Sequence, residues 1–139
     1  MYHAIVRRIV RDGFAKMSST HDAAPIVAQF ADDGVLSFVG TSAIGGEHRG
    51  KQAIARWFAR LFELFPDFKL EPLAVVVEGW PWDTRVATRF AVSATLPDGS
   101  PYTNEGMQFV RLRFGRILED RIYEDTARLE RALAIVAPA

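Results

Sequence analysis

Hydrophobic residues recur at helical spacing in three segments of the first half of the chain. Residues 3–17 carry an apolar residue every three or four positions with arginines between them, and Pro25 suits the first turn of a second, shorter helix. The clearest stripe lies in residues 51–65 and ends before Pro66, which cannot continue a helix. The pattern predicts three helices. Gly13 weakens the first by about 0.5–1 kcal/mol relative to alanine, unless it permits a close crossing by another element.

The pattern changes to short extended runs between and after these helices. We predict a strand over 35–39, a glycine-rich loop over 40–50 and a strand over 68–79. Three consecutive antiparallel strands then follow, over 84–96, 102–114 and 117–125. Residues 97–101 and Gly115-Arg116 supply the turns, and residues 126–136 form a last helix capped by Asp125 or Thr126. The sequence therefore predicts an α+β fold in which a curved sheet wraps over helices, with room for a cavity between them.

Composition narrows the classes of protein that the chain can represent. Its 139 residues fit a single domain, 1–139, and the formal net charge is +0. A neutral chain has no electrostatic footprint for nucleic acid or an anionic membrane, so we expect neither partner. It has no cysteine, and arginines interrupt the apolar run at the N-terminus. We therefore expect a cytoplasmic protein. His3 and His21 lack any ligand spacing, so no metal site is evident, and we expect no cofactor.

Several short motifs, in their order and spacing, resemble the nuclear transport factor 2-like superfamily, in particular its SnoaL-like branch. They are FADDGV at 30–35, GKQAI at 50–54 followed by FPD at 65–67, and RFGRI at 113–117 with Glu119, Tyr123 and Asp125-Thr126 after it. The resemblance spans nearly the whole chain. It implies a cone in which a mostly antiparallel sheet curls over three N-terminal helices around an apolar pocket, with a short C-terminal helix. Members include ketosteroid isomerases, polyketide cyclases, epoxide hydrolases, dehydratases and binders without activity, so the resemblance does not fix the reaction.

The catalytic residues of these relatives transfer poorly to this sequence. Ketosteroid isomerases place a general-base Asp where this chain reads Ser37-Phe38-Val39. Limonene epoxide hydrolases use an Asp-Arg-Asp set, of which only Arg89 is retained, because Ala91 and Ile122 stand at the two carboxylate positions. SnoaL-like cyclases use an Asp on the last strand, where Ile122 again departs from the family. Asp120 or Glu124 can substitute, since period two puts them on the same face as Ile122.

The alignment with the epoxide hydrolases sets a register for the three strands. It places these residues on the pocket side: Arg89, Ala91, Asn104, Gly106, Gln108, Val110, Asp120, Ile122 and Glu124. We then expect Glu124 or Asp120 to act as acid or base, Arg89 to orient it or a ligand carbonyl, and Asn104, Gln108 and Ile122 to contact the ligand. A register one residue off is the alternative. It turns Met107, Phe109, Leu112 and Tyr123 inward and leaves the charged residues in solvent.

Further candidate ligand contacts come from aromatic residues and one histidine. His48 lies in the predicted loop before the long helix, where an imidazole can work as acid or base or simply be solvated. Trp57 can line a slot for an aromatic ligand or pack in the core, and Trp80, with Trp82, can rim the cavity or form a subunit contact. Tyr123 can donate a hydrogen bond to a carbonyl, or pack with its hydroxyl in water.

Two functions fit these observations. The first is a cofactor-independent isomerase, cyclase or lyase acting on a small apolar carbonyl compound. The second is a binding or dimerisation module of the same fold that converts nothing, and an epoxide-hydrolase-like enzyme with a changed active site is a further alternative. On each account the partners are a small apolar or aromatic ligand and a second copy of the chain, because one sheet face otherwise exposes Met107, Phe109 or their neighbours.

Overall fold

The computed structural model describes residues 1–137 as four helices and one sheet. The helices are α1 (Tyr2–Thr20), α2 (Ala24–Gln29), α3 (Lys51–Leu64) and α4 (Thr126–Val136). The strands are β1 (Phe30–Phe38), β2 (Gly46–Arg49), β3 (Lys69–Trp80), β4 (Asp83–Thr95), β5 (Pro101–Arg113) and β6 (Arg116–Glu124). This arrangement confirms the predicted α+β class, and the predicted helices and the three-strand meander are present.

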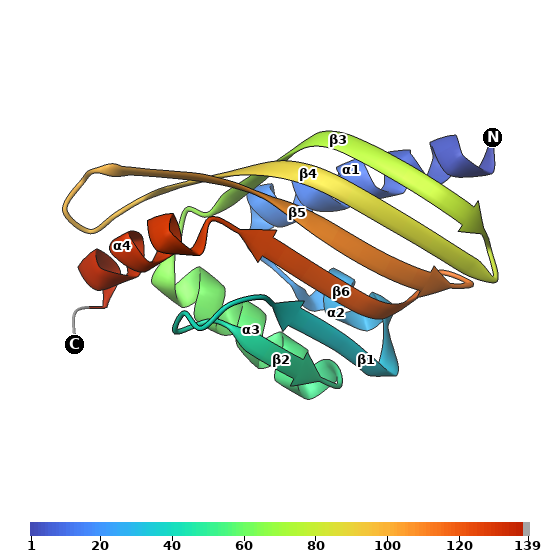
Figure 1. Cartoon of the computed structure of the whole chain (residues 1–139), viewed down its shortest axis with the longest axis horizontal. Helices are drawn as coiled ribbons and strands as arrows, with labels where there is room; N and C mark the ends of the chain where they lie inside the picture. The colour runs from blue at the N-terminus through green and yellow to red at the C-terminus, as the bar shows by residue number, and fades with distance from the viewer. Residues whose placement is uncertain (138–139) are drawn as a thin grey trace.

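The six strands form one curved sheet in the order β2-β1-β6-β5-β4-β3 (Figure 1). All neighbours are antiparallel except β1 and β6, which run parallel. The long meander β3 to β6 has directly paired residues along most of its length, so side chains opposite one another share a face. Gly99 and Gly115 take positive φ in the two turns at the ends of β5, and the turns lie where they were predicted.

Two predictions about the first half of the sheet are wrong. β1 begins at Phe30 and not at residue 35, with a register shift between Phe30 and Val35 where Gly34 lies close to backbone oxygens. Residues 46–49, predicted as loop, form the edge strand β2, which pairs with β1 from Val35↔Arg49 to Phe38↔Gly46. β2 has four residues and is bounded by glycines, so it is too short for an alternation of polar and apolar residues to be recognised. It is a strand because it pairs with β1, and that pairing is not visible in its own residues.

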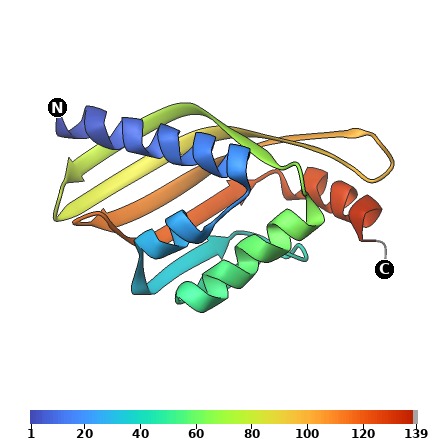
Figure 2. The same ribbon diagram turned by 180° about the vertical axis from the view of Figure 1, so that it is seen from behind.

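Three helices cover one face of the sheet, which is called the inner face here (Figure 2). α1 lies along β3, and α3 lies over β1 and β2. Two histidines hold α1 to the backbone of the strand region. His3, in the helix, donates from Nε2 to the Gly79 carbonyl at 2.7 Å, and His21, which caps its C-terminus, donates from Nε2 to the Phe68 carbonyl at 2.8 Å. No described helix is long and apolar enough to cross a membrane.

The core lies between the inner face and the helices. It includes Phe30, Leu36, Phe38, Ile54, Trp57, Phe58, Phe65, Phe90, Tyr102 and Leu129. Asp125 caps α4 as predicted, since its side chain accepts a hydrogen bond from the Arg128 amide. Gly13 is exposed, and a Cβ there meets nothing within 4 Å. The close crossing that we considered for Gly13 is therefore absent.

Candidate functional site

Asp120 is the most deeply buried charged residue on the inner face of the sheet. It lies on β6, is 3% exposed, and accepts hydrogen bonds from Gln108 Nε2 at 2.8 Å and 2.9 Å, one to each carboxyl oxygen. Burial raises the pKa of Asp120 to about 7, although the hydrogen bond from Gln108 works in the opposite direction. At neutral pH this carboxyl is therefore poised between its protonated and ionised forms.

Glu124 is the second carboxyl on the same side of β6. Burial raises its pKa to about 7. Its hydrogen-bond partner is Asn104 Nδ2 at 3.4 Å, but the same nitrogen also donates to the Tyr102 hydroxyl at 2.8 Å and to the Asp125 carbonyl at 3.0 Å. An amide group has two hydrogens, so the long contact to Glu124 is the weakest of the three. Glu124 thus combines a raised pKa with a carboxyl that is weakly held.

Gly106 makes room for Glu124. The two residues are directly paired between β5 and β6. A Cβ on Gly106 would lie 2.0 Å from the Tyr123 carbonyl oxygen and 2.9 Å from both Glu124 Cγ and the Phe90 ring. Any side chain at this position would displace the backbone of β6 and the carboxylate-bearing side chain with it. The glycine therefore allows Glu124 to lie flat against β5.

The two carboxyls are too far apart to share one proton. They are four residues apart on one strand, and a strand rises about 3.3 Å per residue, which separates their Cα atoms by about 13 Å. Ile122 lies between them on the same face and is 9% exposed. A ligand that touches both carboxyls must therefore lie along β6 over Ile122, and only one carboxyl can serve a given reacting atom.

The expected position of Arg89 is wrong. In β4 the even-numbered residues are buried and face the helices, whereas Arg89 and Ala91 lie on the outer face. The strand pairing agrees, because Phe90 lies opposite Gly106 and Arg89 lies opposite Met107. The register was correct for Asn104, Gln108, Asp120, Ile122 and Glu124 and off by one residue for β4. Arg89 therefore cannot orient either carboxyl.

The aromatic candidates are dispersed rather than gathered at the carboxyls. Tyr123 is on the outer face, 42% exposed, and its hydroxyl accepts a hydrogen bond from Arg121 Nε, so the expected inward contact is wrong. Met107 and Phe109 are exposed as well, which excludes the alternative register for β5. Trp80 is 53% exposed at the end of β3, where it stacks on Tyr2 of α1. Trp57 is 5% exposed and packs in the core.

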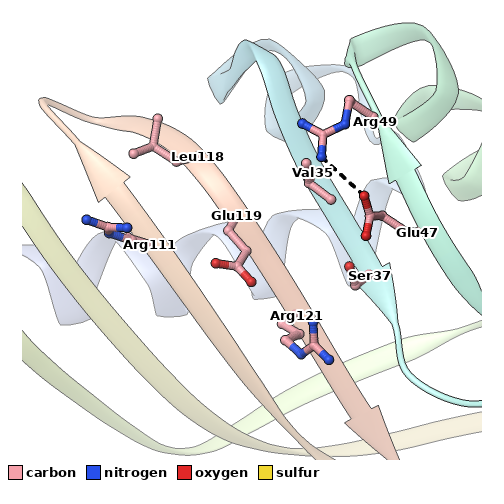
Figure 3. A pocket seen from close by; sticks show the side chains of 8 residues that line it. All are labelled: Val35, Ser37, Glu47, Arg49, Arg111, Leu118, Glu119 and Arg121. Carbon is pink, nitrogen blue, oxygen red and sulfur yellow. Dashed lines mark hydrogen bonds and ion pairs between the residues drawn. The ribbon is translucent and has the colours of Figure 1, made fainter.

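Two of the hollows at the surface of the described residues lie beside charged or aromatic side chains. The larger of these, about 330 Å³, is on the outer face over β1, β2, β5 and β6, and its charged side chains, which have both signs, come from β2, β5 and β6 (Figure 3). It is lined by Val35, Ser37, Glu47, Arg49, Arg111, Leu118, Glu119 and Arg121. The smaller, about 260 Å³, lies between β2 and α3 and includes His48 and Trp57. Neither hollow contains Asp120 or Glu124. Within residues 1–137 no group of three or more His, Asp or Glu side chains is placed to hold a metal ion.

Comparison with known proteins identifies the family. Residues 8–120 match the model of the SnoaL-like domain. The chain belongs to the SnoaL-like family. No curated protein sequence matches this SnoaL-like chain.

Solved structures with the same fold are distant in sequence. Bal32a, from a soil-derived mobile gene cassette, is 23% identical, with a TM-score of 0.76 over 91% of this chain and 94% of that one. TerC, co-crystallised with polyporic acid, is 18% identical, with a TM-score of 0.75 over 92% of this chain and 96% of that one. A protein with a ketosteroid isomerase-like fold from Catenulispora acidiphila, in complex with trimethylamine, is 18% identical, with a TM-score of 0.69 over 88% of each chain. At these identities the likeness establishes the nuclear transport factor 2-like fold and nothing finer.

Sequence reasoning missed two polar residues of this SnoaL-like site. Thr88 is 1% exposed, its Oγ1 is buried without a hydrogen-bond partner among the described residues, and it lies opposite Gln108. Tyr102 is 4% exposed, and burial raises the pKa of its hydroxyl to about 12, to which the nearby charge of Glu124 also contributes. The alternation of β4 identifies the inward position of Thr88, and the spacing of two from Asn104 identifies that of Tyr102.

Proposed function

We propose that this protein is a cofactor-independent enzyme that moves a proton on a small apolar carbonyl compound, as an isomerase, cyclase or lyase, with Glu124 as acid and base. The observation that carries the proposal is the Glu124 carboxyl: its pKa is raised to about 7, and the one hydrogen bond that it accepts from a side chain within residues 1–137, from Asn104, is long. A group whose pKa lies near the working pH accepts and returns a proton with least cost.

In this mechanism the Glu124 carboxylate removes a proton from the carbon beside the carbonyl group. The C–H bond breaks, its electron pair moves toward the carbonyl oxygen, and the protonated Glu124 then returns the proton to another carbon. The Tyr102 hydroxyl accepts a hydrogen bond from Asn104 and keeps its own hydrogen to donate to the developing oxyanion. The Cα atom of Asp120 lies about 13 Å from that of Glu124 along the strand, so a ligand held at Glu124 reaches Asp120 only if it extends along β6 over Ile122.

The class of ligand is inferred from the surroundings of Glu124 and from a structural relative. Phe90 and Ile122 flank the carboxyl on the inner face, which favours an apolar or aromatic compound. The TerC structure, which has the same fold, was obtained with polyporic acid. These observations support a small ring compound that lies along β5 and β6.

Binding without turnover is the second candidate function. Arg89, the residue shared with epoxide hydrolases, faces away from the site, and Asp120 is only 3% exposed. A protein that only holds a ligand needs neither a positioned cation nor an accessible second carboxyl. The two functions differ in one respect, because only the enzyme requires Glu124 to exchange protons with the ligand.

We further propose that the outer face of the sheet pairs with a second copy of the chain. Exposed apolar side chains, Val76 at 64%, Met107 at 46% and Phe109 at 39%, lie on that face beside the charged hollow of Figure 3. A two-fold pairing brings such a patch against itself, and the mixed charges of the hollow suit self-complementary contact. Sedimentation at micromolar concentration is expected to give a dimer, and replacing Phe109 with Asp is expected to give a monomer. A wild-type monomer contradicts this assembly.

The experiment on function begins with a thermal-shift panel of steroids, aromatic polyketides, terpenoid epoxides and fatty acids. A ligand at about one hundred times its dissociation constant stabilises the folded state by roughly 2.7 kcal/mol, which raises the melting temperature by several degrees. Each ligand that stabilises the protein is then incubated with it in D2O, and deuterium incorporation at carbons beside the carbonyl is measured by mass spectrometry.

The decisive variant is Glu124→Gln, with Glu130→Gln as its control. Glu130 is exposed on α4, so the control removes an equal charge away from the site. The enzyme proposal expects Glu124→Gln to lower exchange at least a hundredfold, while it still binds the ligand and Glu130→Gln keeps wild-type rates. Full exchange activity in Glu124→Gln overturns the proposed role, and binding without any exchange in the wild type favours the second candidate.

A further inference from the structure

The smaller hollow, between β2 and α3, combines an apolar floor with a positively charged rim. Its apolar floor is made by Ile44, Ala53 and Trp57, and its rim carries Arg56 and Arg60 from the exposed side of α3. His48 forms the wall on the strand side. Because His48 lies opposite Leu36, its side chain is on the inner face of β2 and points toward α3.

The charged side chains among the described residues that line this hollow, Arg56 and Arg60, are both positive. Arg56 and Arg60 are four residues apart on one helix, which puts two like charges on the same face and costs a small amount of stability. None of the residues that line the hollow is acidic. Arg60 contacts Glu63 at 3.5 Å, but both side chains are exposed, so the pair contributes little. In a chain with no net charge, two adjacent guanidinium groups over an apolar floor favour an anion.

The floor and wall of the hollow offer aromatic surfaces in a fixed arrangement. Trp57 is held by its indole nitrogen, which donates to the Ile44 carbonyl at 2.9 Å. The His48 ring lies with its centroid 6.3 Å from that of Trp57 and is inclined to it by 45°. Burial lowers the pKa of His48, which keeps the imidazole neutral at neutral pH. A neutral ring beside an indole is suited to contact an aromatic molecule.

Two buried polar atoms at this corner lack hydrogen-bond partners among residues 1–137. They are His48 Nε2 and the Oγ of Ser42, the residue before the lining residue Ala43. A buried polar atom without a partner raises the free energy of the folded state. Of the two residues, His48 lines the hollow, so its unpartnered nitrogen belongs to a side chain that a bound ligand would contact.

We propose that this hollow binds a small aromatic carboxylate, with its ring on Trp57 and beside His48 and its carboxylate group against Arg56 and Arg60. A single guanidinium group pairs with a carboxylate in a planar, two-point geometry, and the second arginine beside it adds positive charge. The volume of about 260 Å³ is below that of sites for drug-sized ligands, which indicates a single-ring compound.

This second site is separate from the one proposed for proton transfer. Asp120 and His48 lie on opposite sides of Leu36 in the same row of the sheet, and Leu36 is 0% exposed. A ligand in the hollow therefore cannot contact Asp120. Ligand binding in the hollow and turnover at Glu124 are therefore tested separately, and a negative result for one does not contradict the other.

Benzoate is the probe that tests the proposal, and nuclear magnetic resonance of the indole and imidazole signals is the readout. Trp80→Phe and Trp82→Phe variants identify the remaining indole signal as that of Trp57. Benzoate is expected to shift the Trp57 and His48 signals along a saturable curve. Benzamide, which has the same shape without the charge, and inorganic phosphate, which has the charge without the ring, are each expected to bind at least tenfold more weakly.

The test variant is a double variant that carries both Arg56→Gln and Arg60→Gln. Its control is the single variant Arg131→Gln. All three arginines are exposed, so the melting temperatures are expected to stay at the wild-type value. Where the double variant does not fold, Arg56→Gln alone replaces it. Removing both rim charges is expected to weaken benzoate binding about tenfold, equal to 1.4 kcal/mol, while Arg131→Gln binds as the wild type does. The proposal is overturned by an absence of saturable shifts at about 10 mM benzoate, by equal binding of benzamide or phosphate, or by undiminished binding in the variant.

Discussion

Replacing Asp120 with asparagine is expected to stabilise the protein above neutral pH. The pKa of Asp120 rises from 3.8 in the unfolded chain to about 7 in the folded protein. Each unit of pKa corresponds to about 1.36 kcal/mol, so keeping this carboxyl ionised costs the folded state up to about 4 kcal/mol. Asparagine has no charge to desolvate and still accepts one hydrogen bond from Gln108. The variant is therefore expected to gain about 2–4 kcal/mol at pH 8.

The sign of the pH dependence follows from proton binding. Between pH 3.8 and about 7 the folded protein holds the Asp120 proton and the unfolded chain has released it. The free energy of unfolding therefore falls as pH rises through this window, by about 1.4 kcal/mol per pH unit, and levels off above it. Glu124, whose pKa is also raised to about 7, contributes in the same direction. The free energy of unfolding of Asp120→Asn is therefore expected to fall about half as much between pH 5 and pH 8 as that of the wild type.

Urea unfolding at about pH 5 and about pH 8 measures this difference directly. Glu119→Gln is the matched control, because it removes a carboxylate one residue away on the same strand, in the outer-face hollow of Figure 3. The control is expected to keep the pH dependence of the wild type. Equal pH dependence in the wild type and in Asp120→Asn would refute the argument, because Asp120 would then ionise normally in the folded protein.

Two further substitutions test how local sequence sets stability. Gly13→Ala is expected to stabilise the protein by about 0.5–1 kcal/mol in urea unfolding, since Gly13 is exposed in α1 and a Cβ meets nothing; a loss of stability would contradict this. Asp125→Ala is expected to cost about 1 kcal/mol through loss of the hydrogen bond to the Arg128 amide, whereas Glu130→Ala on the exposed side of α4 should change little. An unchanged midpoint for Asp125→Ala would show that α4 does not need its cap.

Much of the fold could be predicted because its signals are local. The apolar stripe of α3 and the cap at Asp125 depend on neighbours within a few residues, and both were predicted correctly. The strand β2 depends on β1, to which it is joined through a glycine-rich segment, so its own residues do not reveal it. Strand pairing depends on both segments, so it cannot be predicted from the sequence of one short segment such as β2 alone.

The error at Arg89 has a different cause. The even positions of β4 include Val86, Phe90 and Val92, an apolar alternation that by itself turns Arg89 outward. The alignment with epoxide hydrolases places Arg89 on the opposite face from the one that this alternation indicates. For Asp120 and Glu124 the alignment and the alternation agree, and there the predicted face is correct. The raised pKa of Glu124 could not be predicted from sequence, because it depends on burial that the helices and β5 create together.

The central claim is that two inner-face carboxyls of this SnoaL-like domain titrate near neutral pH and so are available for proton transfer. Carbon-13 resonance of the side-chain carboxyl carbons follows this titration, and the variants Asp120→Asn and Glu124→Gln assign the two signals. Both carboxyls are expected to titrate with midpoints near 7. Midpoints near the ordinary values of about 4 would contradict it, because neither group would then hold a proton to exchange at neutral pH.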